Sequence, residues 1–108
     1  MSEFAGALRE RIVIEQRRDQ GRDPGGGTRV KWDYDGAVWA AVAPLIPADL
    51  IAGDVLSALP RWQVTMRKRE GISPATRIVW RGRYLKIRSV ESDPRTPAQM
   101  ILTTEEQR

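Results

Sequence analysis

The stretch RIVWRGRYLKIRSVE, Arg77 to Glu91, decides the fold class of this sequence. Two apolar runs flank Gly82, and glycine supplies the positive φ angle that a tight hairpin turn requires. The second run alternates regularly up to Ile87, but Val90 is out of phase with it, so we expect a bulge near Ser89. The stretch therefore predicts two antiparallel strands.

Four further segments carry the same period-two signal. The clearest is Arg61–Arg69, because Trp62, Val64 and Met66 alternate with polar residues and so share one face. The other three strands are expected at Arg11–Gln16, Ala37–Leu45 and Ala98–Glu106. About six strands, with short turns in the C-terminal half, predict a mainly β protein: a small antiparallel barrel or sandwich.

Two long connections interrupt the N-terminal half. Residues 17–36 are rich in glycine and in charges of both signs, a composition that predicts a flexible loop, with at most a short strand around Val30–Trp32. Residues 46–60 form an insert bracketed by Pro47 and Pro60. Apolar residues recur there at helical spacing, so a short helix or helical loop is expected.

Composition argues against an enzyme. The chain has 108 residues, which predicts one domain over 1–108, and it contains neither histidine nor cysteine. The commonest general base, metal ligands and thiol nucleophile are therefore missing. The close carboxylate pairs, Asp33 with Asp35 among them, lie in polar segments where solvated charge is the simpler explanation. We expect no catalytic residue, no metal site and no cofactor.

The absence of cysteine suits synthesis in a reducing cytoplasm, which the resemblance described below implies to be bacterial, and the hydropathy predicts no membrane association. Net charge is +4, but the cations are interleaved with fourteen acids instead of forming a tract, so charge alone is weak evidence for nucleic-acid binding. No window approaches the ~20 apolar residues of a membrane span.

The tryptophan residues are the other prominent feature of the sequence. Trp39, Trp62 and Trp80 fall in phase with aliphatic neighbours, so we assign them, with Leu85 and Ile87, to the core or to a subunit interface. Trp32 lies in the glycine-rich segment, and the pattern does not decide its role. With Arg29 and Lys31, it could contact nucleic acid by stacking.

The order of segments resembles the head-tail joining proteins of tailed phages, also called head-closure or stopper proteins, which occur as well in gene transfer agents. The resemblance begins at LRERIVIEQR, Leu8 to Arg17, and continues through VWAAVAPL, Val38 to Leu45. Its most specific part is MRKREGISPATRIVWRGRYLKIRSVESD, Met66 to Asp93. The sequence departs from the family pattern in the DPGGG run and in an insert that is more apolar than usual.

The resemblance implies a structural protein of the virion neck, without enzymatic activity. The β-barrel would assemble with itself into a ring, sixfold or twelvefold, that closes the DNA exit channel after packaging. Its partners would be the portal-adaptor complex on the head side, the tail terminator or tail tube on the other side, and packaged double-stranded DNA.

The insert is a candidate channel gate. Asp49 and Asp54 could repel phosphates in a conduit, and copies could meet through Leu50, Ile51 and Val55. An outward-facing insert is the alternative, in which case residues 17–36 could form the gate or reach a neighbouring ring.

Two other classes of protein stay open on the sequence alone. The first is a neck adaptor ring subunit, a class that is usually rich in helices. The second is a small nucleic-acid-binding β-barrel, which would bind oligonucleotides in a salt-sensitive way.

Overall fold

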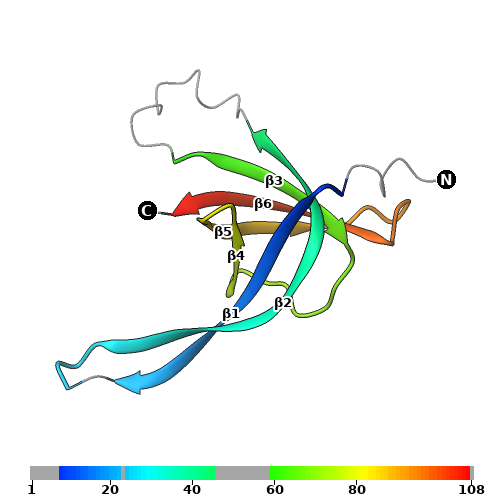
Figure 1. Cartoon of the computed structure of the whole chain (residues 1–108). Coiled ribbons are helices and arrows are strands. Elements are labelled where there is room, and N and C mark those ends of the chain that lie inside the picture. Colours follow the sequence, from blue (N-terminus) through cyan, green and yellow to red (C-terminus); the bar gives the residue numbers. More distant parts are fainter. Residues whose placement is uncertain (1–7, 23, 46–58, 108) are drawn as a thin grey trace, which may run out of the picture.

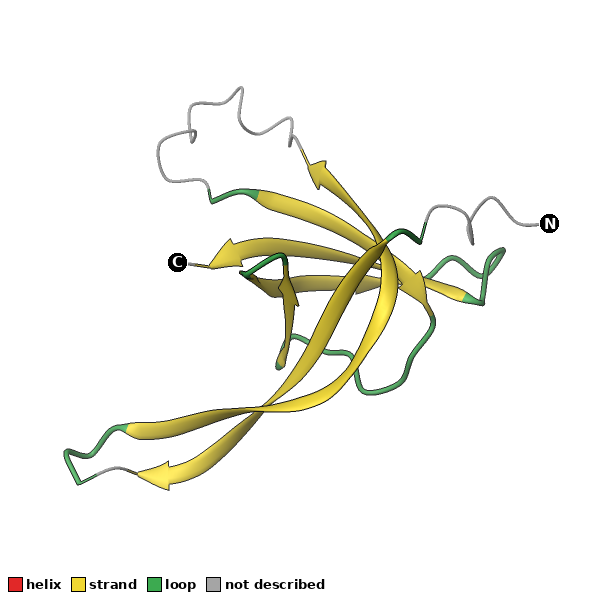
Figure 2. Ribbon diagram, viewed as in Figure 1, coloured by secondary structure: helices red, strands yellow, loops and turns green. Residues whose placement is uncertain are grey.

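A computed structural model of the chain describes residues 8–22, 24–45 and 59–107 (Figure 1). These residues form strands joined by turns and loops, without a helix in the described ranges (Figure 2). The strands are β1 (Glu10–Arg22), β2 (Thr28–Leu45), β3 (Arg61–Arg67), β4 (Thr76–Trp80), β5 (Arg83–Glu91) and β6 (Gln99–Gln107). The prediction of a mainly β protein with about six antiparallel strands is confirmed.

The strands close into a barrel in the order β1-β2-β3-β6-β5-β4, and every neighbouring pair is antiparallel. Closure depends on β1, which pairs with β2 and also with β4 from Val13↔Val79 to Gln16↔Thr76. A closed sheet leaves no unpaired edge along the barrel wall, so the wall cannot recruit another strand by edge pairing.

The core consists of alternate residues of each strand, as a pleated sheet requires. Pairs two residues apart point inward from β1, β3, β5 and β6, and each of these side chains is buried: Ile12, Ile14, Val64, Met66, Leu85, Ile87, Met100 and Leu102. Ala40, Ile78 and Trp80 complete the buried apolar set.

Two tryptophans lie at the end of the barrel where β2 ends and β3 begins. The rings of Trp62 and Trp80 meet edge to face, with centroids 4.8 Å apart. Each indole N–H donates to a carboxylate, Trp62 to Glu106 at 3.2 Å and Trp80 to Glu10 at 2.9 Å. The apolar ring bodies pack inside the barrel while their polar edges meet charge at its rim, as tryptophan favours.

The hairpin details predicted for β4 and β5 are present. Arg81 and Gly82 both have positive φ, 49° and 76°, which matches a tight two-residue hairpin turn. The ladder between β5 and β6 shifts register between Ile87 and Ser89, so the predicted bulge is confirmed.

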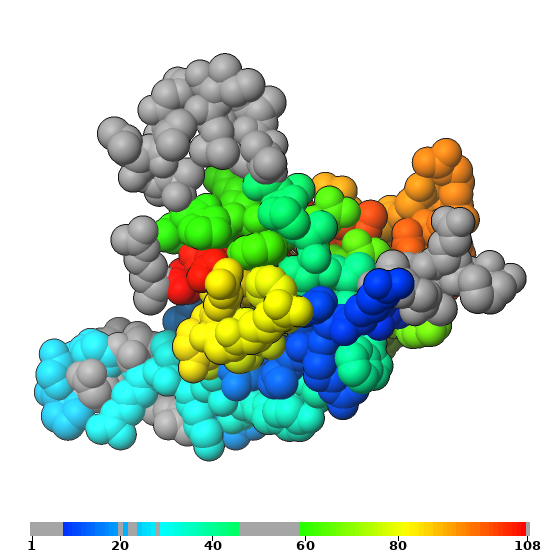
Figure 3. All heavy atoms as spheres, turned by 45° about the horizontal axis from the view of Figure 1, so that its top comes forward, coloured from blue at the N-terminus to red at the C-terminus, as the bar shows by residue number. Residues whose placement is uncertain are grey.

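The prediction of a loop over 17–36 is wrong for most of its length. β1 continues to Arg22 and β2 begins at Thr28, so both strands run into the segment and pair with each other. Beyond Gln16, β1 no longer pairs with β4, and residues 17–34 form a two-stranded hairpin, here called the arm. The arm projects from the barrel (Figures 1 and 3). The expected helical insert, 46–60, lies outside the described residues except for Leu59 and Pro60.

A bulge marks the place where the arm leaves the barrel. Ile14 pairs with Gly36 and Glu15 with Tyr34, so Asp35 is an extra residue in β2. A bulge of this kind bends the strand and increases its twist. Among the described residues, no helix could serve as a membrane span.

Candidate functional site

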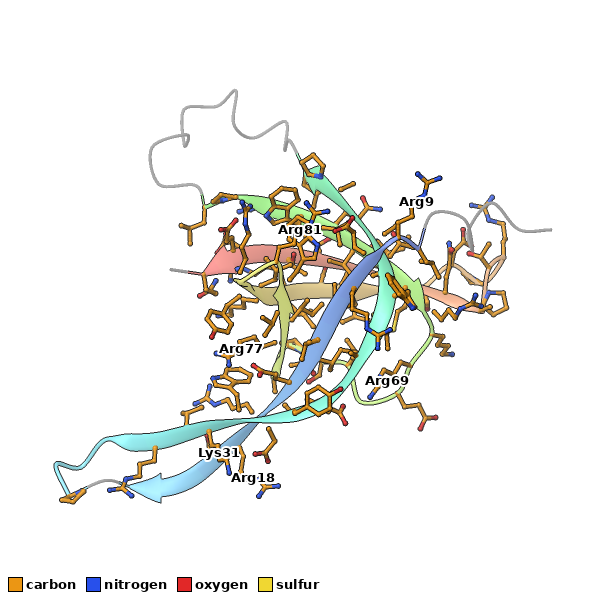
Figure 4. All side chains as sticks on the ribbon, viewed as in Figure 1. Arg9, Arg18, Lys31, Arg69, Arg77 and Arg81 are labelled. Carbon is orange, nitrogen blue, oxygen red and sulfur yellow. The ribbon has the colours of Figure 1, made fainter. Side chains whose placement is uncertain are left out.

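The base of the arm carries a cluster of aromatic and charged side chains on the outer face of the sheet. The Arg77 guanidinium of β4 lies 4.3 Å from the ring centre of Trp32 and 4.2 Å from that of Tyr84. The same guanidinium donates to Glu15, with Nε at 2.8 Å from Oε1. Arg77 thus ties the arm, through Trp32, to the barrel wall (Figure 4).

A pocket of about 330 Å³ opens beside this cluster. Its lining mixes aromatic, basic and small residues from the arm, β4, β5 and the C-terminal end of β6: Arg17, Trp32, Pro74, Ala75, Thr76, Arg77, Tyr84, Lys86 and Gln107. Tryptophan, tyrosine and arginine are the residues that most often dominate the binding energy of protein interfaces. The pocket therefore suits a protein contact better than a reaction.

The arm continues this outer face with apolar side chains. Val30, Trp32 and Tyr34 alternate along β2 and so share one face of the hairpin. Tyr34 is 69% exposed and Val30 is also exposed, although both are large and apolar. Together with Trp32 and Tyr84 they form what we call the aromatic face. The barrel core does not need the exposed members of this face, Val30, Tyr34 and Tyr84, so they are available to another molecule.

The opposite face of the arm is polar. Arg18 and Lys31 both approach Asp33, at 2.6 and 3.9 Å (Figure 4). Their side chains are exposed, so each ion pair contributes little to stability, about 1 kcal/mol or less. The exposed apolar side chains of the arm therefore lie on one face only, which they share with Glu15, Arg17 and Asp19 of β1.

A hydrogen-bond network fixes the start of the arm from the inner side. Gln16 donates to Asp35 at 3.0 Å and to the Gly71 carbonyl at 2.9 Å, and it accepts from Thr76 at 2.8 Å. Arg69 donates to the Asp35 carbonyl at 2.7 Å. The Gln16 hydrogen bond and, after it, the charge of Arg69 hold the pKa of Asp35 below 3.8, although partial desolvation opposes them.

The residues predicted as core or interface divide into two groups. Trp80, Leu85 and Ile87 are buried, and Trp62 packs against the core. Trp39 is 53% exposed, so assigning it to the core of the single chain is wrong. The neighbouring residue, Ala40, points inward and is fully buried instead. The interface alternative for Trp39 stays a prediction.

The other candidate residues are also placed, or lie outside the described part. Arg29 and Lys31 are exposed on the arm, but Trp32 packs under Arg77, so the three do not form one free stacking surface. The candidate gate residues Asp49, Leu50, Ile51, Asp54 and Val55 lie outside the described residues. Within the described ranges, no three acidic side chains gather closely enough to hold a metal ion.

The partners of Trp32 cannot be identified from the sequence alone. Arg77 and Tyr84 lie far from Trp32 along the chain, and only the pairing of β1 with both β2 and β4 brings the three together. The sequence does contain a pattern that indicates the second strand of the arm. In TRVKWDYD, Thr28 to Asp35, apolar or aromatic residues alternate with charged ones, which is the pattern of a strand.

Comparisons with known proteins identify one family and two solved structures of similar fold. A family model described as "Phage head completion protein" matches residues 5–107. The solution structure of a protein from Shigella flexneri 2a is 25% identical, with a TM-score of 0.70 over 94% of both chains. A chain of the native gene transfer agent virion is 22% identical, with a TM-score of 0.65 over 93% of this chain and 96% of that one, and it shares the fold. No curated protein matches the sequence.

Proposed function

Because the chain belongs to the phage head completion protein family, we propose that it forms a ring at the particle neck, closes the DNA exit channel after packaging and provides the platform for tail docking. The protein is a structural component of a virion or phage-like particle, with a role where head and tail join. Its family is not known for enzymatic activity. Ring formation and channel closure are the proposed steps.

The observation that carries the ring is the arm with its aromatic face. A two-stranded hairpin standing away from a barrel is marginally stable by itself, and exposed tyrosine and valine side chains add no stability to a monomer. Both features are accounted for if the aromatic face packs on a neighbouring copy. A ring needs such a contact between two different surfaces of the same chain.

The insert is proposed as the part that faces the channel. β2 ends at Leu45 and β3 begins at Arg61, and these two residues pair with each other, so the segment between them leaves and returns at one point of the barrel wall. In a ring, copies of this point would surround the axis. Asp49 and Asp54 would then repel DNA phosphates, and Leu50, Ile51 and Val55 would make the gate contacts.

Deleting the gene in the particle-producing strain tests the function. We expect electron micrographs to show heads that have leaked DNA, separate from complete tails. Expression of the wild-type gene in trans should restore joined particles. Normal full particles in the deletion strain would overturn the proposal.

A second experiment tests the position of the insert. The double variant Asp49→Lys and Asp54→Lys should assemble rings but retain or release DNA abnormally, because cations would attract the phosphates that the acids repel. Exchange of two exposed acids outside the insert, Glu70→Lys and Glu91→Lys, is the charge-matched control. If the insert variant assembles, retains and releases DNA as the wild type does, the insert does not face the channel.

The neck adaptor ring is the second candidate. Adaptors are usually rich in helices, whereas residues 8–22, 24–45 and 59–107 form a closed β-barrel. This observation favours the stopper over the adaptor.

A further inference from the structure

A second hollow, of about 340 Å³, lies on the outer face of β1, β2 and β3, centred on Trp39. Its lining residues are Arg11, Ala37, Val38, Trp39, Met66, Arg67, Lys68 and Arg69. Four of these eight residues are cations and none is an acid. The lining therefore concentrates positive charge at one place on the described surface, although Arg69 also lies 3.6 Å from the Asp35 carboxylate, which is outside the lining. We propose that the hollow binds the phosphate backbone of DNA.

Strand pairing places the cations around the indole. Arg11 of β1 pairs directly with Trp39 of β2. On the other side, Ala40 pairs with Met66, so Arg67 of β3 comes next to Trp39 in the same direction along the sheet. A row of three residues, Arg11, Trp39 and Arg67, therefore crosses three adjacent strands. Neighbouring strands lie about 4.8 Å apart.

Trp39 positions Arg11 for this role. The Arg11 guanidinium carbon lies 5.2 Å from the ring centre of Trp39, and the indole is 53% exposed. An arginine held against an aromatic face keeps its N–H donors directed outward in its own plane, where they can reach phosphate oxygens. Because the contact also limits the motion of the side chain, less conformational entropy is lost when a phosphate binds.

A second cation is held in place by the protein. Arg69 donates to the Asp35 carbonyl at 2.7 Å and lies 3.6 Å from the Asp35 carboxylate. Lys68 is exposed, and its backbone N–H donates to the Ala98 carbonyl at 2.9 Å, which fixes the chain at the end of β3. The hollow thus combines two cations that are held by contacts within the protein, Arg11 and Arg69, with an exposed lysine.

The chemistry of the lining favours DNA over an acidic protein surface. Apart from apolar groups, the side chains around the hollow can only donate hydrogen bonds: three guanidinium groups, one ammonium group and one indole N–H. A phosphodiester backbone offers only acceptors and negative charge, whereas a protein surface also presents donors. Since the hollow lies on a sheet face and inserts no element into a groove, the contact would be independent of base sequence.

This inference rests on the proposed channel function, because it names the surface that would meet the packaged DNA. The proposal also places two different DNA contacts at different positions along β2, one at the hollow and one at the insert that follows the strand. The hollow is centred at Trp39, and the strand ends at Leu45, roughly 20 Å further along at the rise of an extended strand. The cationic hollow would then hold the DNA end by its phosphates. The anionic insert, at a different position, would keep the DNA from adhering to the gate.

The test is fluorescence anisotropy of labelled 20-base-pair duplexes of two unrelated sequences, with purified full-length protein. Three to four phosphate contacts predict that affinity falls roughly 40- to 150-fold between 50 and 200 mM salt. The double variant Arg67→Glu and Lys68→Glu should weaken binding about tenfold or more and flatten the salt dependence. Trp39→Leu should weaken binding several-fold while leaving the salt dependence nearly unchanged.

The matched control carries the same charge change elsewhere. Arg29→Glu with Lys86→Glu alters two exposed cations outside the hollow, and circular dichroism checks that all variants fold. We expect the control to bind duplex within about twofold of wild type. Equal weakening by both double variants would show that only net charge matters and would overturn the proposal.

Two further results would also overturn it. The first is a wild-type protein that binds neither duplex at 50 mM salt. The second is binding of poly-glutamate, dependent on Arg67 and Lys68, without binding of duplex, which would assign the hollow to an acidic protein partner. The deletion phenotype is a separate readout, so this proposal can fail while the head-closure function stands.

Discussion

Trp80 and Trp39 show how differently one residue type is used in this chain. Trp80 is 6% exposed and donates to Glu10 from inside the barrel rim, whereas Trp39 is 53% exposed on the outer face. We expect Trp80→Ala to lower the free energy of unfolding by about 3–5 kcal/mol, because it leaves a cavity. Trp39→Ala should cost about 1 kcal/mol or less. Urea denaturation followed by circular dichroism measures both, and equal losses would contradict the assignment.

Asp35 gives a pH-dependent prediction at the start of the arm. Its pKa lies below the ordinary 3.8, first because Gln16 donates to its carboxylate. A lowered folded-state pKa stabilises the protein above pH 3.8, and the contribution is lost as pH falls through the folded-state pKa. Gln16→Met should therefore raise the pKa of Asp35 toward 3.8, measured by NMR titration of the carboxyl carbon.

The internal control for this titration is Asp93. Its pKa is lowered by hydrogen bonds from Arg95, which do not involve Gln16. The Asp93 pKa should stay unchanged in the Gln16 variant. If both carboxyl groups shift together, the cause is a global change of the fold and not the loss of one hydrogen bond.

Residue alternation predicts which side a residue faces, but not whether that side is covered. In β1, β3 and β5 only one face is apolar, so the inward residues, such as Ile14 and Met66, follow directly from the pattern. In AVWAAVAPL both faces are apolar or small, so alternation could not decide between Trp39 and Ala40. The covered face is set by β1 and β3 on either side, which the local sequence does not contain.

At the scale of elements, the short hairpin was predictable and the long one was not. Gly82 between two apolar runs identifies the turn of β4 and β5 from local sequence alone. The arm has a loop-like composition, and it is a strand pair because β1 and β2 supply each other's backbone hydrogen bonds. The Arg77 cluster depends on β1 pairing with β4, a contact distant in sequence that no local pattern indicates.

Gly36 is the glycine at which the arm joins the barrel. Its φ is +142°, and a Cβ added there would lie 3.0 Å from Nη2 of Arg69. Gly36→Ala should therefore destabilise the protein by about 1–3 kcal/mol through backbone strain and should displace Arg69. Thermal unfolding measures the loss. Gly82→Ala is the comparison, because its φ is also positive but nothing lies within 4 Å, so its cost should be smaller.

The whole molecule combines a barrel with a buried core and an arm whose apolar side chains are largely exposed. The buried side chains belong to the barrel, and none of the described side chains of the arm is among them. Substitutions on the aromatic face should therefore separate folding from assembly. We expect Val30→Thr with Tyr34→Thr to unfold within a few degrees of wild type, because threonine keeps the strand propensity and both positions are exposed.

The same double variant should fail to restore joined particles when it is expressed in the deletion strain, because the proposed contact between copies would lose its apolar surface. Val90→Thr is the matched control, since Val90 is exposed to a similar extent, at 39% against 41% for Val30, but lies away from the arm. It should restore joined particles. If the arm variant restores them equally well, the aromatic face does not hold the ring together, and the exposed residues of the arm must serve a contact other than assembly.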